Sequence, residues 1–221
     1  MRAADLAMRY DAAELRELAR TRLHQAAPLE ATDLTLAAPC GDDDLNAHLP
    51  PSAEEGPGRA AAVLVPLVRR EAELAVLLTL RTDHLPSHGG QICFPGGKIE
   101  DDDIGPLDAA LREAQEETGL DPRLVEPLGY LDIYQTRTGF RIVPVVGLVD
   151  PVARFTPAEA EVADVFEVPL RFLMDPANHL QESRMWRGVE RRFYAMPYGE
   201  RYIWGATAGM LKKLYDRLYA G

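Results

Sequence analysis

Three glutamates crowd one side of a predicted helix. Glu113, Glu116 and Glu117 are spaced i, i+3 and i+4, so their side chains are neighbours on the helix surface. Like charges at this spacing destabilise a helix, and the last two lie near its C-terminal end, where the helix dipole disfavours anions. Clustered carboxylates are the hard oxygen ligands that Mg²⁺ or Mn²⁺ accept, so bound cations would relieve the repulsion. The alternative interpretation is a solvated acidic face on an ordinary surface helix.

The helix that carries these glutamates is predicted over Pro106–Thr118. Proline suits the first helical position, and Gly119 can take the left-handed conformation that ends a helix. One arc of this helix is apolar and should face the core; it consists of Leu107, Ala110, Leu111 and Ala114. Arg112 lies beside the glutamates and can hold a carboxylate through a bidentate pair.

A glycine pair, Gly96-Gly97, precedes the acidic run. It is either an ordinary turn or a backbone that must approach a ligand or metal closely. A phosphate-binding P-loop is excluded, because Ile99 follows Lys98 where that motif needs serine or threonine. An EF-hand is excluded as well, because Gly105 comes one place too early and no glutamate closes the loop.

The elements around this segment indicate an α+β fold, a mixed β-sheet flanked by helices, because strands and helices mix without a repeating βαβ rhythm. Strands are predicted at 61–68, 74–80, 128–134, 141–149 and 192–196, and helices at 10–25, 157–164, after 169 and at 207–219. Proline- and glycine-rich sequence breaks the order between 26 and 59. We therefore expect an N-terminal helix and irregular arm over 1–59 and one domain over 60–221.

Composition excludes several classes of function. The chain of 221 residues has 35 acidic and 24 basic side chains and a net charge of −11, which disfavours nucleic acid as a partner. No apolar run approaches the length of a membrane span or a signal peptide. Two distant cysteines favour a reducing cytoplasm over a disulfide framework. The helix at 10–25 either caps its own domain or reaches a neighbour, so a homodimer remains open.

The segment from Gly97 to Leu120 (GKIEDDDIGPLDAALREAQEETGL) resembles a Nudix box. Its second half, Arg112 to Leu120, matches the pattern Arg-Glu-x-x-Glu-Glu-x-Gly in full. In the first half the glycine lies one residue further from the arginine than usual, and Asp103 is the spaced acid. This longer spacing is found in the coenzyme A pyrophosphatase branch of the family.

A second motif is similar to the upstream signature of the same branch. It runs from Leu77 to Leu85 (LLTLRTDHL) and continues from Gly90 to Gly97 (GQICFPGG). The resemblance extends from about residue 60 to the C-terminus and implies a Nudix-like α/β/α sandwich. Pro86 stands where an arginine is common.

The resemblance implies hydrolysis of a pyrophosphate that is linked to another moiety. Mg²⁺ or Mn²⁺ would bridge the acidic protein and the anionic substrate and lower the pKa of a bound water. Glu113 and Glu117 are the implied principal metal ligands, and the carbonyl of Gly96 is a further one. Glu116 is either a third ligand or the proton acceptor, and Glu161 is the alternative general base.

Further site residues follow from the same resemblance. Arg81, His88 and Lys98 lie in the signature region and offer positive or hydrogen-bonding groups to the substrate's phosphates. Asp103 and Arg112 are expected to form a structural pair that fixes the loop onto the helix. Arg112 is counted with Glu116 and Glu161 among the catalytic residues.

Three functions are compatible with these features. The leading one is a metal-dependent coenzyme A pyrophosphatase, acting on coenzyme A or acyl-coenzyme A and releasing 3′,5′-ADP and 4′-phosphopantetheine. The second is a broader Nudix hydrolase that takes NADH, ADP-ribose or nucleoside polyphosphates. The third is a non-catalytic Nudix-fold module that binds a nucleotide. All three have a small-molecule partner.

Overall fold

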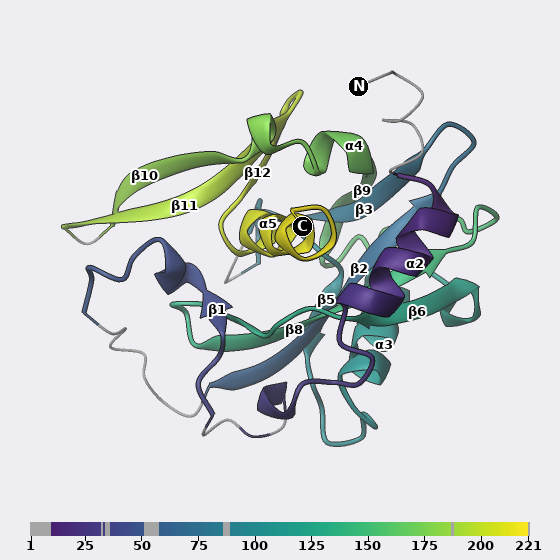
Figure 1. The fold of residues 1–221 in the computed structure, drawn as a ribbon, viewed down its shortest axis with the longest axis horizontal. Helices are drawn as coiled ribbons and strands as arrows, with labels where there is room; N and C mark the ends of the chain where they lie inside the picture. Colours follow the sequence, from purple (N-terminus) through teal and green to yellow (C-terminus); the bar gives the residue numbers. More distant parts are fainter. Residues whose placement is uncertain are drawn as a thin grey trace.

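A computed structural model describes residues 10–31, 33, 36–50, 58–85, 89–186 and 188–220. The architecture is a nine-stranded main sheet, a smaller three-stranded sheet and flanking helices (Figure 1). The main helices are α2 (Ala12–Arg22), α3 (Pro106–Thr118), α4 (Leu170–Leu173) and α5 (Ala206–Leu218). Short 3-10 turns lie at η1 (Leu29–Ala31), η2 (Asp42–Asp44), η3 (Pro122–Leu124) and η4 (Pro176–Asn178). In the described part of the chain, no helix is long and apolar enough to cross a membrane.

The main sheet is mixed, as the sequence predicts. Its strands are β1 (Cys40–Gly41), β2 (Arg59–Arg69), β3 (Leu74–Arg81), β4 (Ile92–Cys93), β5 (Gly96–Lys98), β6 (Val125–Tyr130), β7 (Tyr134–Gln135), β8 (Phe140–Val149) and β9 (Val162–Pro169). The order is β1-β7-β8-β2-β3-β4, with β5 on β2, β6 on β8 and β9 on β3. The central pair β2 and β8 runs parallel over ten residue pairs, whereas β3 runs antiparallel to β2.

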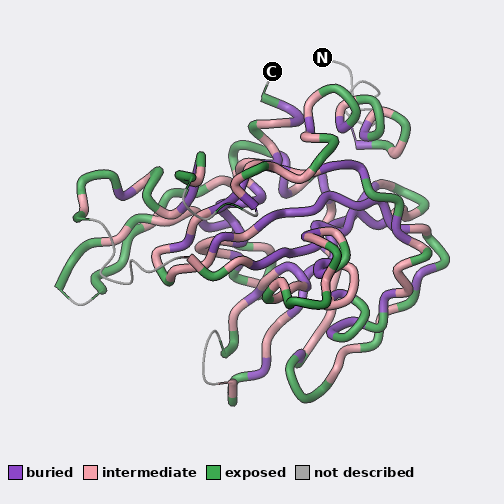
Figure 2. The backbone as a smooth tube through the Cα atoms, turned by 90° about the horizontal axis from the view of Figure 1, so that it is seen from below, coloured by how far each residue is buried: buried purple, intermediate pink, exposed green. Residues whose placement is uncertain are grey.

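Helices cover both faces of the main sheet. Alternate residues of β2 point to opposite faces, so Ala62 and Leu64 pack with the alanines of α3. Val63 and Val65 pack in the other core cluster, which contains α2 and α5. The central strands are accordingly buried along most of their length (Figure 2). The α/β/α arrangement predicted from the sequence is confirmed.

The second sheet consists of β10 (Leu180–Trp186), β11 (Val189–Tyr198) and β12 (Arg201–Trp204) in that order. Its inner end packs in the core through Met196 and Ile203, both fully buried. The β10–β11 hairpin extends away from the main sheet (Figure 1). Only the central part of β11 was predicted from the sequence.

The prediction of a helix over 157–164 is wrong. The chain turns at 159–161 and then enters β9, which pairs with β3 from Ala75 to Arg81. β9 contains three valines and Phe166, and such residues favour a pleated, half-buried strand. The predicted helices over 106–118 and 207–219 are confirmed, the second beginning one residue earlier.

The segment before β2 is attached at several points. α2 packs Leu15 and Ala19 into the core, and β1 pairs with β7 in parallel. The buried Arg141 guanidinium donates to the carbonyls of Leu36 at 2.6 Å and Glu30 at 3.0 Å. Arg141 thereby fastens the irregular arm to β8.

Candidate active site

Helix α3 presents its glutamates at three depths. Ala109, Ala110 and Ala114 are fully buried against the sheet and fix the rotation of the helix. The side chain of Glu117 is then 4% exposed, that of Glu113 18% and that of Glu116 61%. The helix ends at Gly119, whose φ of 67° is the left-handed cap conformation. The acidic face is therefore not uniformly solvated, since two of its three carboxylates are withdrawn from water.

Strand β5 brings glycine backbone against these two carboxylates. The Gly96 N–H donates to Glu117 Oε2 at 3.1 Å. A Cβ placed on Gly97 would lie 2.4 Å from Glu113 Oε1, and one on Gly96 would lie 2.4 Å from the Ala62 carbonyl oxygen. Side chains at either position would displace the strand or the carboxylate, so the glycine pair allows a close approach and is not an ordinary turn.

Arg81, the last residue of β3, joins two acids from different elements. Its Nη1 donates to Glu117 Oε1 at 3.1 Å, and its Nη2 lies 3.8 Å from Glu161 Oε2. The Thr82 N–H donates to the Glu161 carbonyl at 2.9 Å and holds the two segments together. The Arg81 side chain is 21% exposed and that of Glu161 57%. Both terminal nitrogens of Arg81 therefore contact carboxylates in this structure.

Arg112 binds the loop before α3 as well as the glutamates of α3. Its Nε and Nη2 donate to the two oxygens of Asp103, each at 3.0 Å, and Nη2 also donates to the Lys98 carbonyl at 3.2 Å. Its Nη1 donates to Glu113 at 3.0 Å and to Glu116 at 3.4 Å. The acidic loop, the glycine strand and the helix are connected through this one guanidinium.

Burial and hydrogen bonds shift the pKa values of the acids in opposite directions. Removal from water raises the pKa of Glu117 to about 7, although the Gly96 N–H and Arg81 act in the opposite direction. Burial also raises the pKa of Glu113, against the hydrogen bond from Arg112. The Arg112 hydrogen bonds hold the pKa of Asp103 below its usual range. The two withdrawn glutamates therefore favour a nearby cation or proton.

The arrangement is not a preformed metal cage. Across the residues that the structure describes, no three His, Cys, Asp or Glu side chains are grouped closely enough to hold a metal ion. The carboxylates contact arginines instead: Arg112 contacts Glu113 and Glu116, and Arg81 contacts Glu117. The donor chemistry nevertheless fits, because partly desolvated carboxylates beside backbone carbonyls are the oxygen ligands that Mg²⁺ and Mn²⁺ prefer.

The sequence-predicted residues divide into three groups. Eight lie in two clusters of hydrogen bonds and ion pairs beside α3: one consists of Arg81, Gly96, Glu117 and Glu161, and the other of Asp103, Arg112, Glu113 and Glu116. Lys98 is exposed, and its carbonyl accepts from Arg112. His88 lies outside the described residues.

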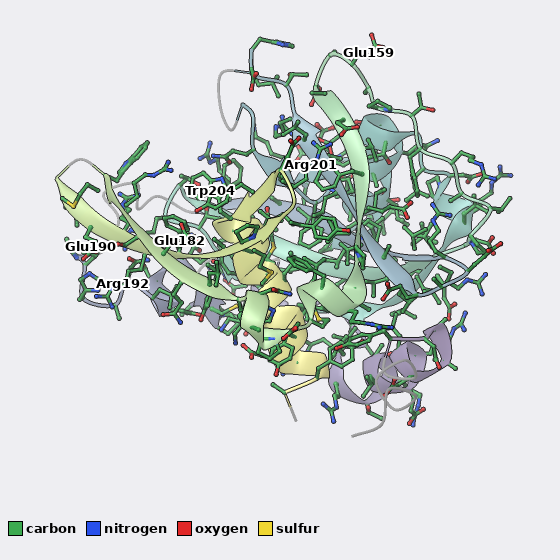
Figure 3. The ribbon with its side chains drawn as sticks, turned by 90° about the horizontal axis from the view of Figure 1, so that it is seen from above. Glu159, Glu182, Glu190, Arg192, Arg201 and Trp204 are labelled. Carbon is green, nitrogen blue, oxygen red and sulfur yellow. The ribbon has the colours of Figure 1, made fainter. Side chains whose placement is uncertain are left out.

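One contributor beside the site was missed by the sequence analysis. Arg201, the first residue of β12, forms an ion pair with Asp164 and lies over the Phe166 ring at 4.4 Å. Figure 3 shows it at the end of its strand, toward the main sheet. This ion pair links the second sheet to β9 at Asp164, which lies three residues after Glu161. No local pattern signals this contact, because the partners are 37 positions apart.

Comparison with known proteins places the chain in a family. Residues 58–188 match the NUDIX domain. The chain is 41% identical over 156 residues to "Uncharacterized Nudix hydrolase NudL" of Enterobacter sp. strain 638, covering 71% of this chain and 81% of that protein. The Escherichia coli K12 protein of the same name is 40% identical with the same coverage. A solved MutT/nudix family protein from Enterococcus faecalis aligns with 95% of this chain and 75% of its own at 19% identity, with a TM-score of 0.49. The chain belongs to the Nudix hydrolase family.

Proposed function

We propose that this protein is a Mg²⁺- or Mn²⁺-dependent coenzyme A pyrophosphatase that releases 3′,5′-ADP and 4′-phosphopantetheine. The observation that carries the proposal is the pair of withdrawn carboxylates, Glu113 and Glu117, facing the glycine strand. Two acids in this position repel an anionic diphosphate unless cations lie between them and it.

Members of this family generally use divalent metal ions. Glu113 and Glu117 would hold the metal, and the Gly96 carbonyl would add a ligand. When bound, the metal would neutralise charge on the diphosphate and lower the pKa of a water. Arg112 and Asp103 hold the glycine strand against the helix. The acids are therefore already oriented before the substrate binds.

Two exposed acids flank the withdrawn pair and are the candidates for taking a proton from the attacking water. Glu116 lies on the same helix, and Arg112 contacts it at 3.4 Å. Glu161 lies before β9 and reaches the pair through Arg81. We assign the role to Glu116, which lies beside both Glu113 and Glu117 on the helix. Glu161 is the second candidate.

The choice of coenzyme A rests on the signature from Leu77 to Gly97. Its two parts are held together, because the Arg81 N–H donates to the Gln91 carbonyl at 3.0 Å and the Gly90 N–H donates to the Arg81 carbonyl at 3.2 Å. One wall of the site is therefore built from the signature. Exposed Lys98 supplies a cation at the rim for a terminal phosphate.

The test is product identification by mass spectrometry after incubation with coenzyme A and Mg²⁺ in ¹⁸O water. We expect 3′,5′-ADP and 4′-phosphopantetheine, with ¹⁸O on one of them. Dephospho-coenzyme A, ADP-ribose and NADH are measured in parallel. If removal of the 3′-phosphate leaves kcat/KM unchanged, the broader hydrolase is the correct function. If coenzyme A binds and no product forms with metal present, the protein is a binding module.

A further inference from the structure

Strand β10 has an open outer edge. It is the terminal strand of the second sheet, and within the described part of the chain it pairs only with β11, over seven residue pairs without a register shift. Natural edge strands are usually protected by a bulge, a proline or charged side chains, lysine above all. β10 (LQESRMW) contains no proline and no lysine, and its two charged residues, Glu182 and Arg184, are of opposite sign, so a strand of complementary charge can reach its free N–H and C=O groups.

Three of the seven side chains along this edge are large, apolar and exposed. Trp186 is 51% exposed, Met185 65% and Leu180 42%. In Figure 3 the outer end of the hairpin, with Glu182 and Glu190 marked on its two strands, projects to the left of the main body. Trp186 is also among the residue types that most often anchor protein interfaces.

The hairpin carries an unbalanced charge. Arg184 lies directly opposite Arg191 in the β10–β11 register, and like charges in that position destabilise a sheet. Neither arginine has a carboxylate partner among the described ion pairs; Arg184 lies over Trp204 at 5.6 Å and Arg191 over Trp186 at 6.0 Å. A carboxylate brought to this edge from outside would relieve the repulsion.

We propose that two copies of the chain pair their β10 strands antiparallel, with the two-fold axis at Ser183. Residues that face each other across antiparallel strands lie on the same face of the sheet. In this register Glu182, whose Oε2 also accepts a hydrogen bond from the Tyr202 hydroxyl at 2.6 Å, faces the partner's Arg184. Leu180 faces the partner's Trp186. Each of these contacts occurs twice by symmetry. The two three-stranded sheets become one six-stranded sheet.

Other registers are disfavoured by the same residues. Moving the two-fold axis by one residue places Glu182 opposite Glu182 of the partner subunit, or Arg184 opposite Arg184 of the partner subunit. Moving it by half a residue joins the inner face of one sheet to the outer face of the other. Of these registers, only the one centred on Ser183 is self-complementary, which favours a second copy as the occupant of this edge. The inference does not depend on the substrate.

The experiment is sedimentation velocity on the full chain over the micromolar range. We expect a dimer for the natural protein. Glu182→Arg and Arg184→Glu each place like charges opposite one another twice and should weaken dimerisation by about 100-fold. The double reversal Glu182→Arg/Arg184→Glu restores both opposite-charge pairs and should restore the dimer. Glu200→Arg, in the β11–β12 turn away from the edge, is the matched control and should leave the dimer intact.

A cysteine at Ser183 tests the position of the axis. Cα atoms of directly facing antiparallel residues are about 4.5–5.5 Å apart, within the range a disulfide spans. Ser183→Cys should form a covalent dimer on mild oxidation, and Gln181→Cys, which faces the partner's Met185, should not. Near-UV circular dichroism checks that each variant is folded. A natural chain that is monomeric throughout, a dimer unaffected by the single reversals, or a double reversal that stays monomeric would overturn the proposal, whatever the outcome of the product assay.

Discussion

Two arginines hold carboxylates beside helix α3, and they do so differently. Arg112 uses three nitrogens, and both oxygens of Asp103 accept from it at 3.0 Å. Arg81 makes one hydrogen bond to Glu117 at 3.1 Å and a longer contact of 3.8 Å to Glu161. In the first arrangement every guanidinium nitrogen donates a hydrogen bond, and the acidic loop is fixed to the helix. The second leaves a withdrawn carboxylate with one weakly held counter-charge, which a ligand cation can replace.

The comparison is tested most severely by Glu117→Gln. The amide keeps an acceptor for the Gly96 N–H and removes the charge, so the fold should survive. We expect kcat/KM for coenzyme A to fall by about 10³-fold, the scale of losing a group that stabilises charge in the transition state. Glu159→Gln, at an exposed position in the turn before β9, should leave kcat/KM unchanged. An active, metal-responsive Glu117→Gln enzyme would refute the assignment of Glu117.

Paired substitutions at the two exposed acids distinguish their roles. Glu116→Gln should lower kcat by about 100-fold, as expected for loss of a positioned proton acceptor. Glu161→Gln should cost no more than about tenfold, because it loses only its contact with Arg81. The measurement is steady-state turnover at saturating Mg²⁺. The reverse order would transfer the role of general base to Glu161.

Asp103→Asn weakens the two hydrogen bonds that Arg112 donates to Asp103. We expect kcat to fall by about tenfold, the scale of losing a group that orients a ligand, and the free energy of unfolding to fall by about 2 kcal/mol. The folded pKa of Asp103 is lowered, so its stabilisation is present above the ordinary aspartate value of about 3.9 and is lost as pH falls below it. Denaturant melts from pH 7 to pH 3 should show this loss in the natural protein.

The matched control for Asp103 is Asp102→Asn, since Asp102 is an exposed neighbour in the same loop. Its unfolding free energy should stay within about 0.5 kcal/mol of the natural value at every pH. Equal effects of the two substitutions would show that the Arg112–Asp103 pair does not fix the loop.

Arg81→Gln tests whether a metal cation can take the place of Arg81 beside Glu117. Removing the counter-charge should strengthen Mn²⁺ binding by at least about fivefold, since an ion pair is worth about 1 kcal/mol even where it is exposed. Free Mn²⁺ is counted by electron paramagnetic resonance, with exposed Arg154→Gln as the control. Weaker Mn²⁺ binding in Arg81→Gln would mean that Arg81 organises Glu117 for the metal.

The smallest expected effect concerns the two cysteines: treatment of the folded protein with an alkylating reagent should leave turnover nearly unchanged, because the thiols react slowly. Burial raises the pKa of both thiols to about 11, so little thiolate is present at pH 8. The native protein should react with iodoacetamide about 100-fold more slowly than the unfolded chain, and mass spectrometry measures the extent. Fast labelling of Cys93, whose thiol interacts with Arg81, would show that this side of the site opens.

Local patterns predicted the parts of the fold whose residues are close in sequence. The 3.6-residue apolar period, Pro106 and Gly119 define α3 to the residue, and valine-rich runs predict β2 and β3. The first three residues of β9 were assigned to a helix, and the rest of the strand was not predicted, because its strand character depends on pairing with β3, about 90 positions earlier. Two strands of the second sheet, β10 and β12, were missed because they are exposed or short and lack a strong apolar alternation.

The sequence by itself determined the chemistry of this protein: which acids share a helix, which glycines precede them, and which family the motifs resemble. Only the tertiary structure decided how deep each acid lies and which arginine it contacts. Glu116 and Glu117 are adjacent in sequence, yet one is 61% exposed and the other 4%. That difference arises because the sheet and β5 cover one side of α3 and leave the other in water, and burial depends on contacts that no local pattern encodes.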